Sequence, residues 1–181
     1  VYWICPLIEE SENLDLNAVM ETYEDLSEHF SQEKVGCLHG KLSAIKKQEQ
    51  IQAFKDSKTS ILVSTTVVEV GVDIPDADIM VIENAERFGL AQLHQLRGRI
   101  GRGTKESFCI LLHKDKIQDV SSQRLQVLVD SQDGFKIAEE DLVIRGPGEI
   151  MGAQQTGIVP MKYTNLVRDS QYLMETKKVA E

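Results

Sequence analysis

Short apolar runs alternate with amphipathic stretches along the first 112 residues. The apolar runs are typical of strands and fall at 1–8, 35–38, 61–65, 79–82 and 108–112. Helical spacing of apolar side chains follows at 15–30, 43–55 and 90–96. Strands without in-and-out alternation indicate a parallel sheet that is buried on both faces. The pattern therefore predicts an α/β fold with helices on both faces of the sheet.

Individual positions refine the expected helices. Asp15 is the expected N-cap of the first helix, because an aspartate side chain can accept a hydrogen bond from the free N–H groups of the first turn. The second helix is expected to bury Ile51 and Phe54, with Ile45 as a further candidate.

The pattern changes after Leu112. Helical spacing at 121–131, with Leu125, Leu128 and Val129 on one face, and again at 135–144 predicts a helical hairpin that turns at Gly134. The run 145–149, Arg-Gly-Pro-Gly-Glu, is expected to break the second helix and to open an irregular loop, and helical spacing returns at 165–180. We expect one domain over 1–116, and a unit of hairpin, loop and last helix over 117–181.

Composition and charge limit the classes of function. The chain has 181 residues, 41% hydrophobic and 27% charged, which suits one domain with a real core. Its net charge of -9 means that any site for a polyanion must be local, because free-standing nucleic-acid binders are usually basic over their contact face. Such a local patch exists, since five basic residues follow the lone acid Glu86: Arg87, Arg97, Arg99, Arg102 and Lys105.

The cysteines and the ends of the chain bear on its setting. Cys5, Cys37 and Cys109 lie far apart in apolar runs, which predicts reduced, buried thiols of a cytosolic protein and no metal site. No apolar run approaches the roughly 20 residues of a membrane helix. The chain begins inside a strand-like run without methionine, so we expect a piece of a longer protein.

The segment 95–102, Gln-Leu-Arg-Gly-Arg-Ile-Gly-Arg, carries the first candidate chemistry. A guanidinium is a planar fork of donors that suits phosphate oxygens. If the helix at 90–96 continues, Gln95 and Arg99 share one face, and Arg102 follows three residues later. The alternative for an isolated segment of this kind is a solvated basic turn that makes surface ion pairs.

Other polar segments follow the predicted strands. In parallel sheets, ligands collect beyond the carboxyl ends of the strands. His39 and Gly40 follow one strand, and Thr65 ends another, ahead of the run Glu69 to Asp73. Taken singly, His39 could serve packing alone, Thr65 could cap a helix, and Asp73 could start a turn.

The loop that cradles phosphates in many nucleotide-binding proteins is missing. It needs a glycine five residues before Gly40 and a hydroxyl after the lysine, but Val35 and Leu42 occupy those places. No adjacent acidic pair at a strand end suggests a magnesium site. What remains are arginines that could reach the γ-phosphate of a nucleotide held by another domain, a role that suits Arg99 and Arg102.

These motifs together resemble superfamily 2 helicases. The run from Ser64 to Asp73 resembles their motif V, and the Gln-x-x-Gly-Arg-x-Gly-Arg spacing of 95–102 resembles their motif VI. The run 141–149, followed by Gln155-Thr156-Gly157, resembles the translocation motif of the RecG family. The related Mfd family of transcription-repair coupling translocases usually has Arg-Gly-Ala-Gly there, so Pro147 and Glu149 favour RecG.

The resemblance implies a role for each matching residue. Arg102 would be the arginine finger with Arg99 beside it, while Gln95, Gly71 and Asp73 would contact ATP. On the same grounds, the implied DNA contacts are His39, Gly40 and Thr65. The implied coupling residues are Arg124, Arg145 and Gln155.

The resemblance also implies partners. ATP with Mg²⁺ would bind between this RecA-like domain and a first one, which would supply the metal ligands, and the whole bacterial, cytoplasmic enzyme would remodel branched or forked DNA with the help of a DNA-gripping domain. The chain alone is expected to be inactive. An Mfd-like translocase and a non-catalytic RecA-like scaffold remain as alternatives, and Arg124 and Arg145 could simply form surface ion pairs with Asp130, Glu139 or Asp141.

Overall fold

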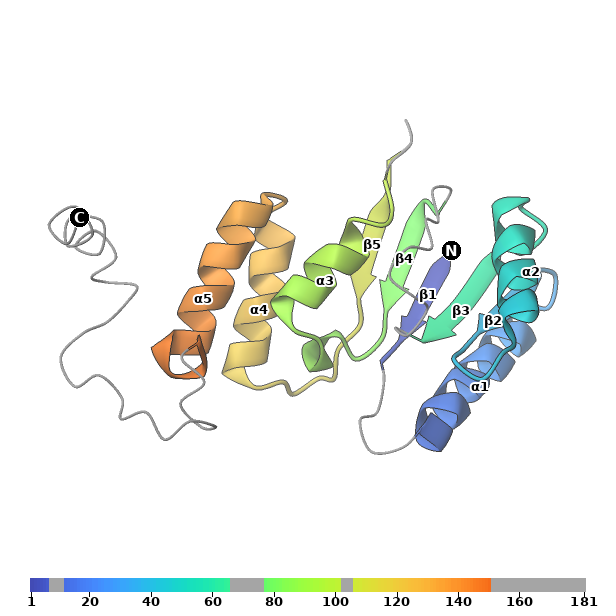
Figure 1. Cartoon of the computed structure of the whole chain (residues 1–181), viewed down its shortest axis with the longest axis horizontal. Helices are drawn as coiled ribbons and strands as arrows, with labels where there is room; N and C mark the ends of the chain where they lie inside the picture. Colours follow the sequence, from blue (N-terminus) through green and yellow to red (C-terminus); the bar gives the residue numbers. More distant parts are fainter. Residues whose placement is uncertain (7–11, 66–76, 102–105, 151–181) are drawn as a thin grey trace, which may run out of the picture.

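A parallel sheet of five strands forms the centre of the fold (Figure 1). The computed structural model describes residues 1–6, 12–65, 77–101 and 106–150, without the side chains of 12–15 and 145–150. The strands lie in the order β2-β3-β1-β4-β5 and every pairing between neighbours is parallel. They are β1 (Tyr2–Cys5), β2 (Val35–Leu38), β3 (Ile61–Thr65), β4 (Ile79–Ile82) and β5 (Phe108–Leu111). The predicted α/β class is confirmed.

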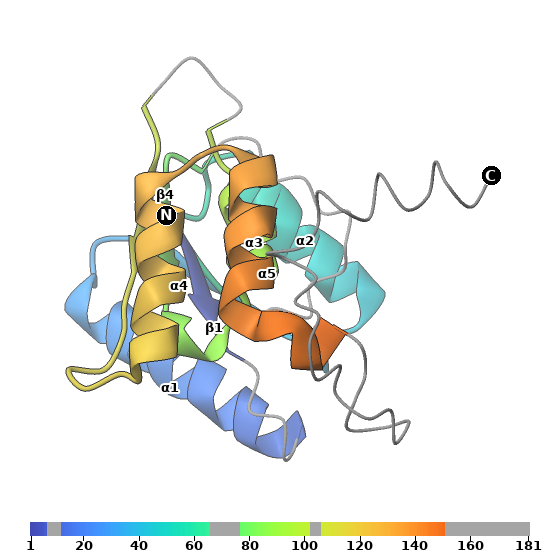
Figure 2. The same ribbon diagram turned by 90° about the vertical axis from the view of Figure 1, so that its left-hand side faces the viewer.

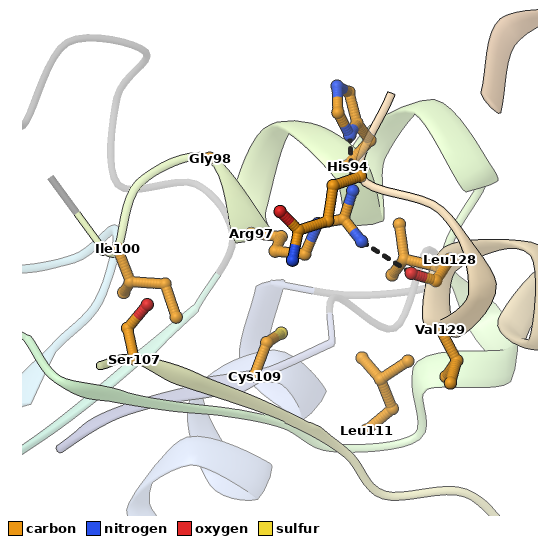
Figure 3. Close-up of a pocket in the computed structure, with 11 residues that line it drawn as sticks. His94, Arg97, Gly98, Ile100, Ser107, Cys109, Leu111, Leu128 and Val129 are labelled. Atoms are coloured by element: carbon orange, nitrogen blue, oxygen red, sulfur yellow. Dashed lines mark hydrogen bonds between the residues drawn. The ribbon is translucent and has the colours of Figure 1, made fainter. Parts of the chain in front are cut away.

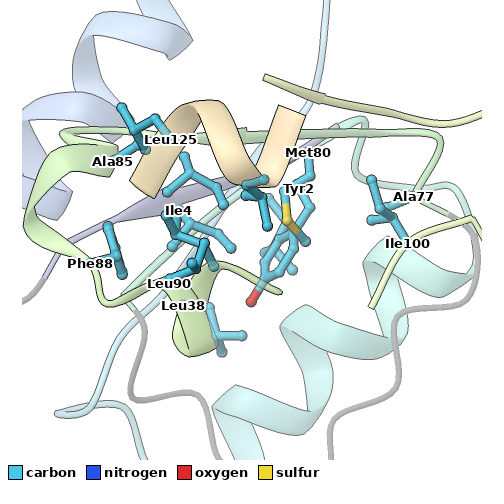
Figure 4. Close-up of a cluster of buried hydrophobic side chains, with 14 of the residues drawn as sticks. Tyr2, Ile4, Leu38, Ala77, Met80, Ala85, Phe88, Leu90, Ile100 and Leu125 are labelled. Atoms are coloured by element: carbon cyan, nitrogen blue, oxygen red, sulfur yellow. The ribbon is translucent and has the colours of Figure 1, made fainter. Parts of the chain in front are cut away.

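The central strands are buried on both faces, as the lack of alternation predicted. Tyr2 and Ile4 of β1 belong to a large apolar cluster on one face, while Cys5 belongs to a smaller cluster on the other. Figure 4 shows the large cluster, in which Tyr2 and Ile4 gather with Leu90 and Leu125. Successive side chains of a strand point to opposite faces, so an apolar run can only be satisfied when both faces are covered.

Helices supply the cover on each face. α1 (Glu12–His29) packs Val19 and Leu26 into the smaller cluster. On the other face, α2 (Ala44–Lys55) buries Phe54, and α3 (Leu90–Arg97) buries Leu90 and Leu93 after the short 3₁₀ helix η1 (Ala85–Arg87). No helix of the described ranges is long and apolar enough to cross a membrane.

Two expectations for the first helices are wrong. The helix α1 starts at Glu12, three residues before the expected cap at Asp15. Acidic residues favour the first turn of a helix, which allows the earlier start. In α2, whose cap Ser43 accepts from the Lys46 amide at 3.4 Å, Ile45 is 71% exposed. It lies nine residues before Phe54, half a turn around the helix, and therefore faces away from the sheet.

The predicted hairpin consists of α4 (Asp119–Asp130) and α5 (Gly134–Ile150), which run side by side (Figure 2). Leu125, Leu128 and Ile137 belong to the large cluster, so the hairpin shares its core with the sheet. Val129 was expected on the same face but is 70% exposed, because one step along a helix turns the side chain by about 100°.

The expected break at 145–149 is also wrong, since α5 continues through Pro147 to Ile150. A proline removes one backbone donor and crowds the preceding turn, but a helix can bend at that point instead of ending. Figure 2 shows α5 bending towards its C-terminal end. Asp141, named above as a possible partner in a surface ion pair, is buried at 9% exposure.

Candidate functional site

The carboxyl ends of β2 and β3 bring two predicted DNA contacts to one edge of the sheet. Leu38 pairs with Ser64, so His39 and Thr65 follow at the same level. Thr65 is buried, and neither its Oγ1 nor the buried Nδ1 of His39 has a hydrogen-bond partner among the described residues. Buried polar atoms are normally hydrogen-bonded. Both atoms could therefore form a hydrogen bond with a ligand at this edge of the sheet.

The surroundings of His39 are electropositive. Burial lowers the pKa of His39, and the nearby charges of Lys47 and Lys41 lower it further. Gly40 is exposed, and a Cβ at this position would meet nothing within 4 Å. A neutral imidazole beside two ammonium groups, next to an open glycine, suits the approach of a phosphate backbone.

The arginine segment leaves α3 through a tight turn. The Gly98 amide donates to the His94 carbonyl at 3.0 Å, and the Arg99 amide donates to the Leu96 carbonyl at 2.9 Å. Gly101 then takes the left-handed conformation at φ +74, and Ile100 is buried. The helix has ended at Arg97, so the expectation that Gln95 and Arg99 share one helical face is wrong.

Arg99 is half-buried, and its charge acts on Tyr2 of β1. Burial raises the pKa of Tyr2, while a hydrogen bond with Ser64 and the charge of Arg99 oppose that rise. Gln95 is exposed on α3. Four further predicted site residues lie outside the described residues: Gly71, Asp73, Arg102 and Gln155.

Arg97 has a role that the sequence did not indicate. Its guanidinium Nη1 donates to the carbonyl oxygen of Leu128 at 2.6 Å, and its Nη2 lies 3.2 Å from Nδ1 of His94 (Figure 3). Nη1 also donates to the carbonyl oxygen of Ser131 at 2.8 Å. The sequence grouped Arg97 with the arginines that could hold a polyanion, whereas the structure turns it towards the hairpin. The sequence contains one indirect indication of this role: α4 has no basic residue of its own in its last turn that could bind the free carbonyls there.

A cavity of about 460 Å³ lies between the end of α3, β5 and the end of α4. Its wall includes Arg97, Cys109 and Leu128 (Figure 3). Burial raises the pKa of the Cys109 thiol, and the charge of Arg97 partly offsets that rise. The cavity therefore borders the arginine segment and the hairpin at once.

All three cysteines are free thiols, but only Cys5 is fully buried, while Cys37 and Cys109 are partly exposed. The expectation of three buried thiols is thus wrong for two of them, because a residue near the edge of a small sheet is only partly covered. Within the described ranges, no group of three or more His, Cys, Asp or Glu could hold a metal ion.

The hairpin carries the predicted coupling residues. Arg124 of α4 is half-buried, and its buried Nε has no hydrogen-bond partner among the described residues. A buried guanidinium nitrogen without a partner costs free energy. Arg124 is therefore not the exposed arginine that the alternative, a surface ion pair, requires. Arg145 lies in α5, and only its backbone is described.

Comparison with protein families places these elements. Residues 3–104 match the helicase conserved C-terminal domain, which is more than half of the chain. Residues 131–181 match the C-terminal part of domain 3 of the ATP-dependent DNA helicase RecG. The first match covers β1 to β4 and the arginine segment, and the second covers α5 of the hairpin.

Individual relatives agree with the family matches. The ATP-dependent DNA helicase RecG of Pasteurella multocida is 54% identical over 93% of this chain and 24% of that protein. The RecG proteins of Haemophilus influenzae and Synechocystis are 50% and 51% identical over 99% and 100% of the chain, and over 26% and 22% of their own lengths. The chain thus spans about a quarter of these relatives.

Solved structures give the same result. The structure of RecG bound to a three-way DNA junction matches 95% of this chain and 22% of that chain, with a TM-score of 0.66 and 46% identity. The C-terminal domain of the DEAD-box protein Dbp5 matches 80% of this chain and 81% of that chain with a TM-score of 0.52, but at 19% identity it shows the fold alone. The chain therefore belongs to the helicase conserved C-terminal domain family, and it is RecG-like along almost its whole length.

Proposed function

We propose that this chain is the second motor domain, with hairpin and translocation region, of an ATP-dependent DNA helicase that remodels stalled forks and Holliday junctions. One observation carries the proposal: 95% of the chain aligns at 46% identity with RecG in a structure whose partner is a three-way DNA junction. Residues 1–116 would form the motor domain and 117–181 the coupling unit, in a protein of the bacterial cytoplasm.

ATP with Mg²⁺ would bind at a seam between this domain and a first RecA-like domain. The first domain would supply the phosphate loop and the metal ligands, since 35–42 lacks the residues of such a loop. The half-buried Arg99 and Arg102 would neutralise charge on the phosphoryl oxygens. Gln95, Gly71 and Asp73 would contact the rest of the nucleotide.

The edge formed by β2 and β3 would bind DNA. His39, Gly40 and Thr65 follow adjacent strand ends, beside the positive charges of Lys41 and Lys47. Contacts of this kind position a nucleic acid through its phosphates and carry no sequence information. A separate DNA-gripping domain of the parent protein would select the branched structure.

The hairpin would convert opening and closing of the seam into movement along DNA. Arg124, Arg145 and Gln155 are the proposed coupling residues. The match of 131–181 to RecG favours this assignment over the transcription-repair translocase that the sequence left open.

The test uses the full-length protein. Arg102→Ala should abolish DNA-stimulated ATP hydrolysis and leave nucleotide binding largely intact, because an arginine finger acts on charge that develops in the transition state. Hydrolysis and the dissociation constant of a nucleotide analogue are the two measurements. Lys34→Ala is the control, since Lys34 is an exposed basic residue just before β2 and outside the proposed contacts. A loss of binding as large as the loss of rate would refute the assignment.

A further inference from the structure

Arg97 lies in the arginine segment but bonds to the hairpin. One residue separates it from Arg99, so the two side chains share a short stretch of backbone that leaves α3. The carbonyl oxygens that Arg97 binds belong to Leu128 and Ser131, 31 and 34 residues further along the chain. Movement of this backbone is therefore applied directly to the end of α4.

The bonded carbonyls are ones that need a donor. The last four carbonyls of a helix have no donor within it, and α4 ends at Asp130. Leu128 and Ser131 are both buried, and Arg97 donates to the carbonyl oxygens of both. A cation at a helix C-terminus is also favoured by the helix dipole, and α4 has no basic residue of its own in its last turn.

His94 aligns the guanidinium. Its Nδ1 lies 3.2 Å from Nη2 of Arg97, and since a guanidinium can only donate, Nδ1 must be the acceptor. The other side of the ring faces the first residue of α5, where a Cβ added to Gly134 would lie 3.0 Å from Nε2. The imidazole thus stands between Arg97 and the turn of the hairpin.

The cavity makes these bonds more important. Close packing is what normally transmits displacement between elements of a protein. Beneath Arg97, between β5 and the end of α4, there is a space of about 460 Å³ (Figure 3). Leu93 and Leu128 still pack in the large cluster, so the hydrogen bonds of Arg97 add to that packing on the side of the cavity.

We propose that Arg97 is a positioning residue that transmits movement of the arginine segment to the turn between α4 and α5, and that His94 holds it in line. The proposal rests on the proposed function, since it assumes that the hairpin couples ATP hydrolysis to movement on DNA. It adds a direct mechanical link to the coupling residues named above.

The test compares variants of the full-length protein for DNA-stimulated ATP hydrolysis and for unwinding of a model fork. Arg97→Gln should keep hydrolysis within about threefold of wild type and reduce unwinding by roughly tenfold or more, the effect of losing one or two charge-assisted hydrogen bonds. His94→Leu should likewise reduce unwinding more than hydrolysis. His94→Asn should keep unwinding near the wild-type level, because its Oδ1 can accept in place of Nδ1. Lys34→Gln is the exposed control and should change neither activity, because Lys34 precedes β2 at the opposite edge of the sheet.

Hydrogen exchange gives a readout that simple destabilisation would not reproduce. In wild type, a non-hydrolysable ATP analogue should change the exchange of amides at 128–134. In Arg97→Gln that change should disappear, while the change at 90–96 persists. His94→Leu leaves Arg97 and both carbonyls in place, and therefore decides the matter if Arg97→Gln proves unstable.

Either of two results would overturn the inference: unwinding that stays at the wild-type level, or hydrolysis and unwinding that fall by the same factor. Failure of the proposed function has a different signature, because wild type itself would then show no DNA-stimulated hydrolysis or fork unwinding.

Discussion

Gly98 and Gly101 lie three residues apart in the arginine segment, yet replacing each by alanine should change stability in opposite directions. Gly101 has φ +74, which costs an alanine about 1–2 kcal/mol. A Cβ there would also collide with Oγ of Ser107, which adds roughly 1–3 kcal/mol. Gly101→Ala should therefore destabilise the chain by about 2–5 kcal/mol and lower its melting temperature on the order of 10 °C.

Gly98 is the matched control. Its backbone is helical at φ -66 and ψ -3, and the nearest atom to an added Cβ is the His94 carbonyl oxygen at 3.5 Å, an ordinary contact. Gly98→Ala should stabilise by about 0.4–1 kcal/mol, because alanine loses less backbone freedom on folding. Both variants can be measured by urea and thermal unfolding of the 181-residue chain.

A double variant separates the two costs at Gly101. Adding Ser107→Ala removes the colliding Oγ and leaves a Cβ contact of 3.4 Å, so only the cost of the positive φ should remain. Two results would show that the turn after α3 differs from the one described. Gly101→Ala could be as stable as wild type, or Gly98→Ala could lose as much stability as Gly101→Ala.

Two further predictions concern the isolated chain and its thiols. The 181-residue chain should not hydrolyse ATP, since it lacks the phosphate loop, and turnover above that of an Arg99→Ala control would contradict this. Burial raises the pKa of Cys5 to about 12 and that of Cys37 to about 11, above the value of about 8.5 for an unfolded thiol. This contribution to stability is therefore complete below about pH 8.5 and is lost as pH rises towards 11–12, and Cys5→Ala should reduce the alkaline loss. An unchanged stability curve for Cys5→Ala between pH 8.5 and 11 would count against the burial of this thiol.

The strands were predictable because their signal is local. β2, β3 and β4 begin and end where the apolar runs predicted, and their burial on both faces follows from the absence of alternation. The positions of His39 and Thr65 at one edge follow in turn from the rule for parallel sheets. The spacing of 95–102 was equally visible, since a motif is read directly from the order of its residues.

Helix limits and helix faces were less predictable. Asp15 could cap the first helix, but the acidic residues before it also allow the start at Glu12. The choice depends on tertiary packing, which a short stretch of sequence does not contain. Pro147 and its flanking glycines disfavour a helix, yet α5 bends and continues. Ile45 and Val129 are apolar but face away from the core, because a narrow contact between helix and sheet excludes residues that lie 100° or more from its centre.

The order and spacing of residues were enough to predict the class of fold, the parallel sheet and the family, because these depend on local patterns and on motifs. The bonds of Arg97 could not be predicted, because they depend on contacts between distant parts of the chain. Arg97 and Arg99 are nearly neighbours in the same motif, but Arg97 donates to the hairpin, whereas the charge of Arg99 acts on Tyr2 of β1. The partners of Arg97 are 31 and 34 residues away, and their carbonyls become available only when α4 ends beside α3.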